Sequence, residues 1–160
     1  VQGKNENSQL FVSILDFEGP DNATKRNEIW SKMHDIELDG GFINYMYAWT
    51  IKDRKERINE FENFLKQEKE DGDTYFHILN ALGYAYYNID EKEKAKYYLD
   101  EYVRVYPNGY NSHDSIGEYF YNEKDYKSAL VHYEKALQQY PLSNSANKKV
   151  KELREKLGKK

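Results

Sequence analysis

The chain has 160 residues, of which 39% are hydrophobic and none is cysteine, and its 24 basic and 28 acidic residues leave a formal net charge of -4. This size suits one ordinary domain or a short stack of repeats. The lack of cysteine excludes a disulfide framework, and the evenly mixed charges argue against a nucleic-acid-binding face. A mean hydropathy of -1.03, with no apolar run of about 18 residues, excludes a membrane-spanning helix.

The first segment, residues 1–41, is expected to be irregular or helical. Thr24 to Leu38 suits a helix because its apolar residues recur at helical spacing, at Ile29, Trp30 and Met33. Ser8 to Phe17 fits either a helix or a short strand, and we favour a helix because a lone strand has no partner in a helical stack. The polar start at Val1 fits either a removed leader or a piece of a longer gene.

Residues 42–73 are predicted to form a degenerate helical hairpin. Apolar residues recur at helical spacing in two runs, which are Tyr45, Ala48 and Trp49, and then Ile58, Phe61, Phe64 and Leu65. Compared with the hairpins that follow, Phe61 replaces a small residue and Asp73 replaces a proline. Gly40 and Gly41 interrupt the chain just before this segment, which places its first helix after them.

Residues 74–143 contain the strongest pattern, because Pro107 and Pro141 are 34 residues apart and the positions before them correspond. The first interval has Leu79, Leu82, Gly83, Tyr86, Ala95 and Leu99, and the second has His113, Ile116, Gly117, Phe120, Ala129 and Tyr133. Spacings of three, four and seven residues lie on one helix face, so each interval predicts two amphipathic helices. The glycine and alanine are small where the two helices cross.

Turn signals divide each interval into a helical hairpin. The turns are predicted at Asn88 to Asp90 and at Asn122 to Asp125. Asp90 followed by Glu93 has the spacing of a capping pair at the start of a helix. Each proline lacks an N–H group and disfavours helix in the residue before it, and so each is expected to end a second helix.

This period and pattern resemble the tetratricopeptide repeat family, with clear repeats at 76–107 and 110–141. The resemblance implies an all-α fold, a right-handed α-solenoid of helix-turn-helix hairpins. Because the flank of a last hairpin needs a cover, residues 144–160 are predicted to form a capping helix, with Asn144 or Ser145 as its N-cap residue and Gly158 as its stop. Its apolar stripe is Ala146, Val150, Leu153 and Leu157.

No residue pattern predicts catalysis. None of the four histidines stands in a metal-ligand spacing, and His113 is expected to be packed inside the fold. Asp114 and Glu118 could act as paired carboxylates, although a solvated pair on a helix is favoured. The sequence therefore predicts a protein that is not an enzyme, with no catalytic residue, no metal and no cofactor.

The concave face that first helices form in such a stack is the predicted binding site. Its residues are His77, Asn80, Tyr84, Tyr87, Asn88, Asn111, Asp114, Glu118, Tyr121 and Asn122. Asparagine can pair with a peptide backbone and tyrosine offers rigid contact area, although merely solvated positions would also be polar. The family's chaperone-tail binders use lysine and arginine clamps on these helices. Neither residue occurs among these positions, which argues against a C-terminal carboxylate ligand.

The predicted function is a non-enzymatic protein–protein interaction module that binds a peptide or partner segment. Two alternatives stay open. The chain could be the C-terminal appendage of a larger secreted hydrolase, or a self-association module that forms a homo-oligomer through its aromatic flank. No nucleic-acid partner and no membrane span are expected. The chain is expected to be soluble, in the cytoplasm or exported after removal of a leader.

Overall fold

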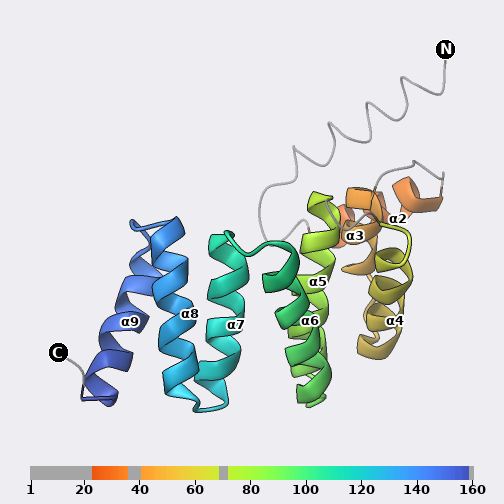
Figure 1. Ribbon diagram of the computed structural model, residues 1–160. Helices are drawn as coiled ribbons and strands as arrows, with labels where there is room; N and C mark the ends of the chain where they lie inside the picture. Colours follow the sequence, from red (N-terminus) through yellow and green to blue (C-terminus); the bar gives the residue numbers. More distant parts are fainter. Residues whose placement is uncertain (1–22, 36–40, 69–71, 159–160) are drawn as a thin grey trace. The chain divides into compact units, whose positions relative to one another are not determined.

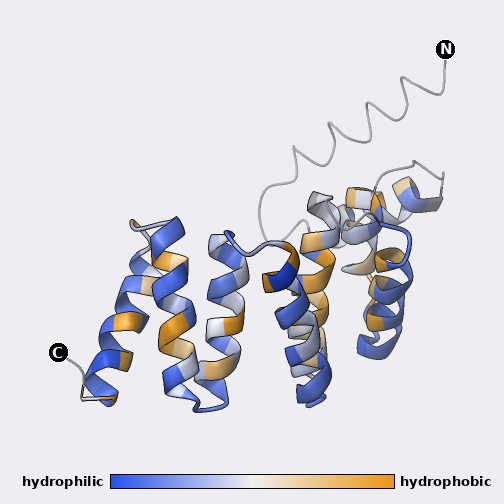
Figure 2. Cartoon of the chain, in the orientation of Figure 1, coloured by the Kyte–Doolittle hydropathy of each residue, from blue (hydrophilic) through white to orange (hydrophobic). Residues whose placement is uncertain are grey.

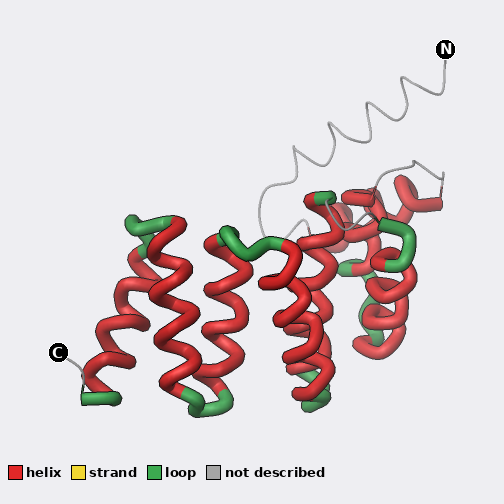
Figure 3. The backbone as a smooth tube through the Cα atoms, in the orientation of Figure 1, coloured by secondary structure: helices red, strands yellow, loops and turns green. Residues whose placement is uncertain are grey.

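The computed structural model describes residues 23–35, 41–68 and 72–158, and its elements fall into two compact units that divide between Glu68 and Lys69 (Figure 1). Within these ranges the chain forms eight α-helices and no strand (Figure 3). The predicted all-α fold is confirmed. No helix in the described ranges has the length and apolar character needed to cross a bilayer. The segment Ser8 to Phe17 lies outside the described residues.

The N-terminal unit contains α2 (Ala23–Asp35), α3 (Gly41–Ala48) and α4 (Arg54–Leu65). α2 corresponds to the helix predicted from Thr24, and residues 36–40 beyond it are not described. α4 begins after Asp53, whose carboxylate accepts hydrogen bonds from the backbone N–H groups of Lys55 and Glu56. The buried residues of this unit include Trp30, Met33, Ala48, Ile58, Phe61 and Phe64.

Phe61 explains why this unit departs from the pattern of the later hairpins. Its ring is fully buried, with ring centroids 5.8 Å from Tyr45 and 5.3 Å from Trp49. Packed rings therefore separate α3 and α4, in place of the close crossing that a small residue allows. α4 falls within the predicted hairpin and α3 begins one residue before it, at Gly41, so Gly41 is part of the helix; the status of the pair as a degenerate repeat stays a prediction.

The C-terminal unit contains two helical hairpins and a final helix (Figure 1). α5 (Asp73–Tyr87) pairs with α6 (Lys92–Val105), and α7 (Tyr110–Asn122) pairs with α8 (Tyr126–Gln139). The second hairpin packs on the first through α6 and α7, and α9 (Asn144–Lys156) packs on α8. Figure 2 shows mostly hydrophilic residues along α8 and α9, with hydrophobic residues at intervals, which is the pattern of amphipathic helices that bury one face.

The two hairpin turns have the same backbone form. Asp90 and Lys124 both have φ near +63°, and the next N–H group closes the turn on a carbonyl of the first helix, from Glu91 to Tyr86 and from Asp125 to Phe120. The predicted capping role of Asp90 is wrong, because this residue forms the left-handed turn. Glu91 is the N-cap residue of α6, and it makes no side-chain capping bond. In the second hairpin Asp125 does cap α8.

α9 covers the outer flank of the second hairpin. Ala146, Val150 and Leu153 are buried against residues of α8, namely Ala129, Leu130 and Tyr133. Ser143 is the N-cap residue, with its hydroxyl accepting from the N–H group of Ala146 at 3.2 Å. The prediction of Asn144 or Ser145 as the cap is therefore wrong, because the helix starts one residue earlier. Gly158 has φ +64° and ends the helix in the predicted place.

Candidate functional site

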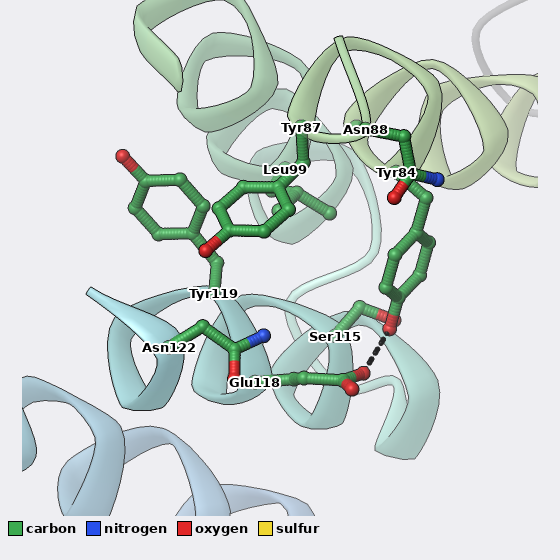
Figure 4. A pocket seen from close by; sticks show the side chains of 9 residues that line it. Tyr84, Tyr87, Asn88, Leu99, Ser115, Glu118, Tyr119 and Asn122 are labelled. Carbon is green, nitrogen blue, oxygen red and sulfur yellow. Dashed lines mark hydrogen bonds between the residues drawn. The ribbon is translucent and has the colours of Figure 1, made fainter. Parts of the chain in front are cut away.

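A pocket of about 160 Å³ lies between α5 and α7, where the first helices of the two hairpins face each other (Figure 4). α6 contributes a single side chain at its base. The lining residues are Gly83, Tyr84, Tyr87, Asn88, Leu99, Ser115, Glu118, Tyr119 and Asn122. The pocket therefore combines aromatic rings, amide groups and one carboxylate around an apolar floor.

Tyr84 and Glu118 join the two helices across the pocket. The Tyr84 hydroxyl donates a hydrogen bond to Glu118 Oε2 at 2.6 Å (Figure 4). Burial raises the pKa of Tyr84, and the hydrogen bond to Glu118 raises it further. The hydroxyl therefore stays protonated at neutral pH and holds the carboxylate in place.

Tyr87 and Tyr119 form the opposite aromatic wall. Their rings meet edge to face, with centroids 5.7 Å apart and planes at 78°. The Tyr87 hydroxyl donates to Glu123 Oε1 at 2.9 Å, and burial is the main cause that raises the pKa of Tyr87. Lys92 pairs with the same Glu123 carboxylate at 3.0 Å. These two contacts of Glu123 hold the Tyr87 ring in place and pair the Lys92 ammonium with a carboxylate that does not line the pocket.

The charge on this face is negative. Glu118 is exposed, and no basic side chain among the described residues forms an ion pair with it. Asp114 lies one turn earlier on α7 and accepts a hydrogen bond from the Tyr110 hydroxyl at 3.1 Å. Burial raises the pKa of Asp114, as does the nearby charge of Glu118. A cation entering this face would therefore meet complementary charge.

The structure brings half of the predicted groove residues to the pocket. Tyr84, Tyr87, Asn88, Glu118 and Asn122 line it, whereas His77, Asn80, Asn111, Asp114 and Tyr121 do not. Asn80 lies one turn before Tyr84 on α5, where its side-chain oxygen is buried without a hydrogen-bond partner. The Asn111 amide donates to the Tyr102 hydroxyl at 3.2 Å.

Tyr121 is held by the capping helix. Its hydroxyl donates to Glu152 of α9, and the Lys149 ammonium lies 3.5 Å from the centre of its ring. Its position in the second repeat corresponds to that of Tyr87 in the first. Tyr121 therefore links α7 to α9 through Glu152, just as Tyr84 links α5 to α7 through Glu118.

Sequence reasoning missed Leu99, Ser115 and Tyr119 as pocket residues. The sequence places Leu99 only on the apolar face of the second helix of its hairpin, yet the side chain packs directly against Gly83 and the two residues form the floor of the pocket. Ser115 and Tyr119 occupy α7 positions four residues apart, which places them on one face. The signal that could have found them is their spacing to Asn122, which continues the same face.

His113, which is buried, contacts the partly buried His132 inside the second hairpin. His113 Nε2 lies 2.9 Å from the carbonyl oxygen of Pro107, which can only accept, so this nitrogen donates. The Nδ1 atom of a neutral His113 then accepts from His132 Nδ1, 3.0 Å away. Burial lowers the pKa of both side chains, that of His132 to about 4. His113 is packed, as predicted. In the described residues no group of three His, Cys, Asp or Glu side chains could hold a metal ion.

The comparisons agree with this architecture. A tetratricopeptide repeat profile matches residues 81–109 and 115–143, whereas no curated protein sequence matches the chain. Among solved structures, the crystal structure of MamA is similar, with 17% identity, a TM-score of 0.67, and coverage of 89% of this chain and 85% of MamA.

Two further structures are similar in fold. BtubC from P. vanneervenii has 17% identity and a TM-score of 0.69, over 84% of this chain and 66% of BtubC. The matched chain of the APC/C hetero-tetramer Cut9-Hcn1 has 20% identity and a TM-score of 0.69, over 80% of this chain but only 26% of that one. Residues 81–109 and 115–143 therefore match two adjacent tetratricopeptide repeats, and this part of the chain forms two consecutive helical hairpins.

Proposed function

We propose that the face formed by α5 and α7 binds an extended peptide or partner segment, and that the chain is a non-enzymatic interaction module. Tetratricopeptide repeats serve as protein–protein interaction modules, and the two repeats of this chain support that role. One observation carries the finer proposal. The first helices of the two repeats enclose a pocket of about 160 Å³ whose lining is polar and aromatic.

The chemistry of the lining suits a peptide main chain. Asn88 and Asn122 are exposed, lie 34 residues apart at the same repeat position, and both line the pocket. Each amide can donate to a peptide carbonyl and accept from a peptide N–H group. The tyrosine rings around them supply contact area with little side-chain entropy to lose. The similar Cut9-Hcn1 structure is an assembly of two proteins, which agrees with a binding role for the fold.

A peptide selection tests the proposal directly. Linear peptides displayed on phage are selected on the intact chain, and the affinity of a selected peptide is then measured by calorimetry. The variant Asn88→Ala/Asn122→Ala removes two sets of amide hydrogen bonds without changing charge. We expect affinity to fall about thirtyfold, since one lost hydrogen bond per amide, at on the order of 1 kcal/mol each, amounts to about 2 kcal/mol.

The matched control lies on the second helices. Tyr97 of α6 and Val131 of α8 are exposed and also stand 34 residues apart. The variant Tyr97→Ala/Val131→Ala should bind the peptide like the parent chain. Binding that survives the asparagine changes but is lost in this control would place the site on the second helices and contradict the proposal.

A further inference from the structure

We propose that the pocket between α5 and α7 receives the side chain of an arginine from the bound peptide. This inference rests on the binding role proposed above, and it names the ligand group that the pocket selects. The lining contains three tyrosines and one glutamate but no basic residue. That composition is the opposite of the lysine and arginine clamps that recognise a terminal carboxylate.

The tyrosine rings give the pocket an affinity for cations. Tyr84 forms one wall, and Tyr87 with Tyr119 forms the other (Figure 4). Ring faces carry negative electrostatic potential, so a cation between these walls is attracted by about 0.5 to 2 kcal/mol for each suitable ring. The Tyr84 and Tyr87 rings are already fixed by their hydroxyl hydrogen bonds to Glu118 and Glu123, so little entropy is lost when a ligand enters.

Glu118 supplies the charge at the edge of the pocket. Tyr84 binds only its Oε2 atom, which leaves Oε1 and the remaining lone pairs available for a ligand. Two lysines of the neighbouring helix α6 are engaged elsewhere: Lys92 pairs with Glu123, and Lys96 pairs with Asp100. The Glu118 carboxylate is therefore positioned and charged, with no ion-pair partner in the described residues.

The remaining features favour arginine over lysine. A planar guanidinium has five N–H donors that match carboxylate geometry and stack on rings, whereas an ammonium is a compact point charge. Glu118 and the Asn122 amide line the pocket and supply acceptor oxygens, and the Ser115 hydroxyl beside them is already hydrogen-bonded to Tyr84. The buried Leu99 floor suits the methylene stem, and the volume is several times what one water molecule needs.

The proposal is tested with capped tripeptides of the form Gly-X-Gly, where X is arginine, lysine or citrulline. Citrulline keeps the shape of arginine but is neutral. Each tripeptide is titrated into the intact chain labelled with ¹⁵N, and amide shifts are followed by NMR. We expect the arginine peptide to shift the resonances of α5 and α7 around the pocket, and to bind at least about tenfold more tightly than the citrulline peptide.

Two charge variants locate the effect. Glu118→Gln should weaken arginine binding about tenfold and leave citrulline binding unchanged. Glu155→Gln removes an exposed carboxylate from α9 and should change neither. Equal binding of the arginine and citrulline peptides at α5 and α7, or arginine binding that is insensitive to Glu118→Gln, would overturn the arginine pocket while the peptide groove stands.

The phage-selected peptides provide a second, independent test of the arginine pocket. If the proposal holds, selected sequences carry an arginine, and its replacement by citrulline lowers affinity about tenfold. Selected peptides that lose binding in the Asn88→Ala/Asn122→Ala variant but contain no arginine would refute the arginine pocket alone. If no peptide is selected and no tripeptide shifts a resonance of α5 or α7, both the binding role and this inference fail.

Discussion

The two repeats have glycine at the same position of the helix crossing, but the side chains packed against that glycine differ. At Gly83 an added Cβ atom would lie 2.6 Å from Leu99 Cγ and Cδ2, whereas at Gly117 it would lie 3.4 Å from the Tyr133 ring. The first crossing is therefore full, and the second has room for a methyl group. The need for glycine at this position depends on the residue across the hairpin, so a shared consensus does not imply a shared constraint.

The interiors differ in polarity as well. The second repeat places His113 and His132 where the first has Leu79 and Tyr98. Tyr98 stacks on Tyr86 with centroids 5.5 Å apart. The first hairpin is therefore closed by apolar and aromatic contacts, and the second by a hydrogen-bonded histidine pair whose pKa values are lowered by burial.

The largest expected effect is the loss of stability when the second repeat is deprived of α9, the helix that covers it. Deleting residues 144–160 should destabilise the second repeat by about 3 to 6 kcal/mol, because Val150 and Leu153 each bury an apolar side chain against it. Urea unfolding followed by circular dichroism measures the loss. If the deletion variant has the parent midpoint and stays monomeric, α9 is not the cover that the second repeat requires.

Alanine at the two glycines separates the crossings. Gly83→Ala should destabilise the chain by about 1 to 3 kcal/mol, because Leu99 is buried and cannot move aside. Gly117→Ala should be neutral or stabilising by up to about 1 kcal/mol, since alanine is the better helix former. Urea midpoints that shift equally for the two variants would mean that the crossings are equivalent.

Acidification should weaken only the second repeat. Because the folded pKa values of His113 and His132 are lowered, the unfolded chain binds more protons, and stability is complete above the ordinary pKa of 6.5. It then falls toward the folded pKa of His132, about 4. We expect a loss of about 1 to 2 kcal/mol between about pH 7 and about pH 5.

The first repeat supplies the control for this pH effect. The double variant His113→Leu/His132→Tyr installs the residues of the first repeat and should remove the pH dependence in that range. Lys96 and Lys135 also lower the pKa of His132, and Asp100 opposes them, so the slope should flatten at high salt. An unchanged slope in the double variant would assign the pH dependence to other groups.

The smallest difference lies at the starts of the second helices. Asp125→Ala should cost about 1 kcal/mol, because the carboxylate caps the Ser128 N–H group. Glu91→Ala should be nearly neutral, since Glu91 makes no capping bond. Thermal unfolding of the two variants measures both values, and a larger loss for Glu91→Ala would reverse the assignment of the caps.

The fold of residues 73–158 was predictable because the repeat fixes it at several levels. Two prolines, two glycines and the apolar spacing all indicate the same hairpins, and the structure has helices at each predicted place. The N-cap residues of α6 and α9 were predicted one or two residues away from their true positions, Glu91 and Ser143. A left-handed residue closes each hairpin, and from sequence Asp90 fits a cap as well as a turn.

The pocket was predictable only in part, because spacing gives the face of a helix but not its contacts. Tyr87 and Tyr121 occupy the same repeat position, yet one lines the pocket and the other bonds to Glu152. That difference depends on which helix follows, α7 or α9. Leu99 was missed because its role depends on the depth of the crossing at Gly83, which no local pattern encodes.

The central claim is that the first helices of the two repeats bind a ligand at the pocket between them. NMR titration of the intact ¹⁵N-labelled chain with a selected peptide tests it most directly. We expect shifted amides concentrated around Tyr84, Asn88, Glu118 and Asn122, with little change along α6 and α8. Shifts concentrated around Tyr97 and Val131, with α5 and α7 unaffected, would contradict it.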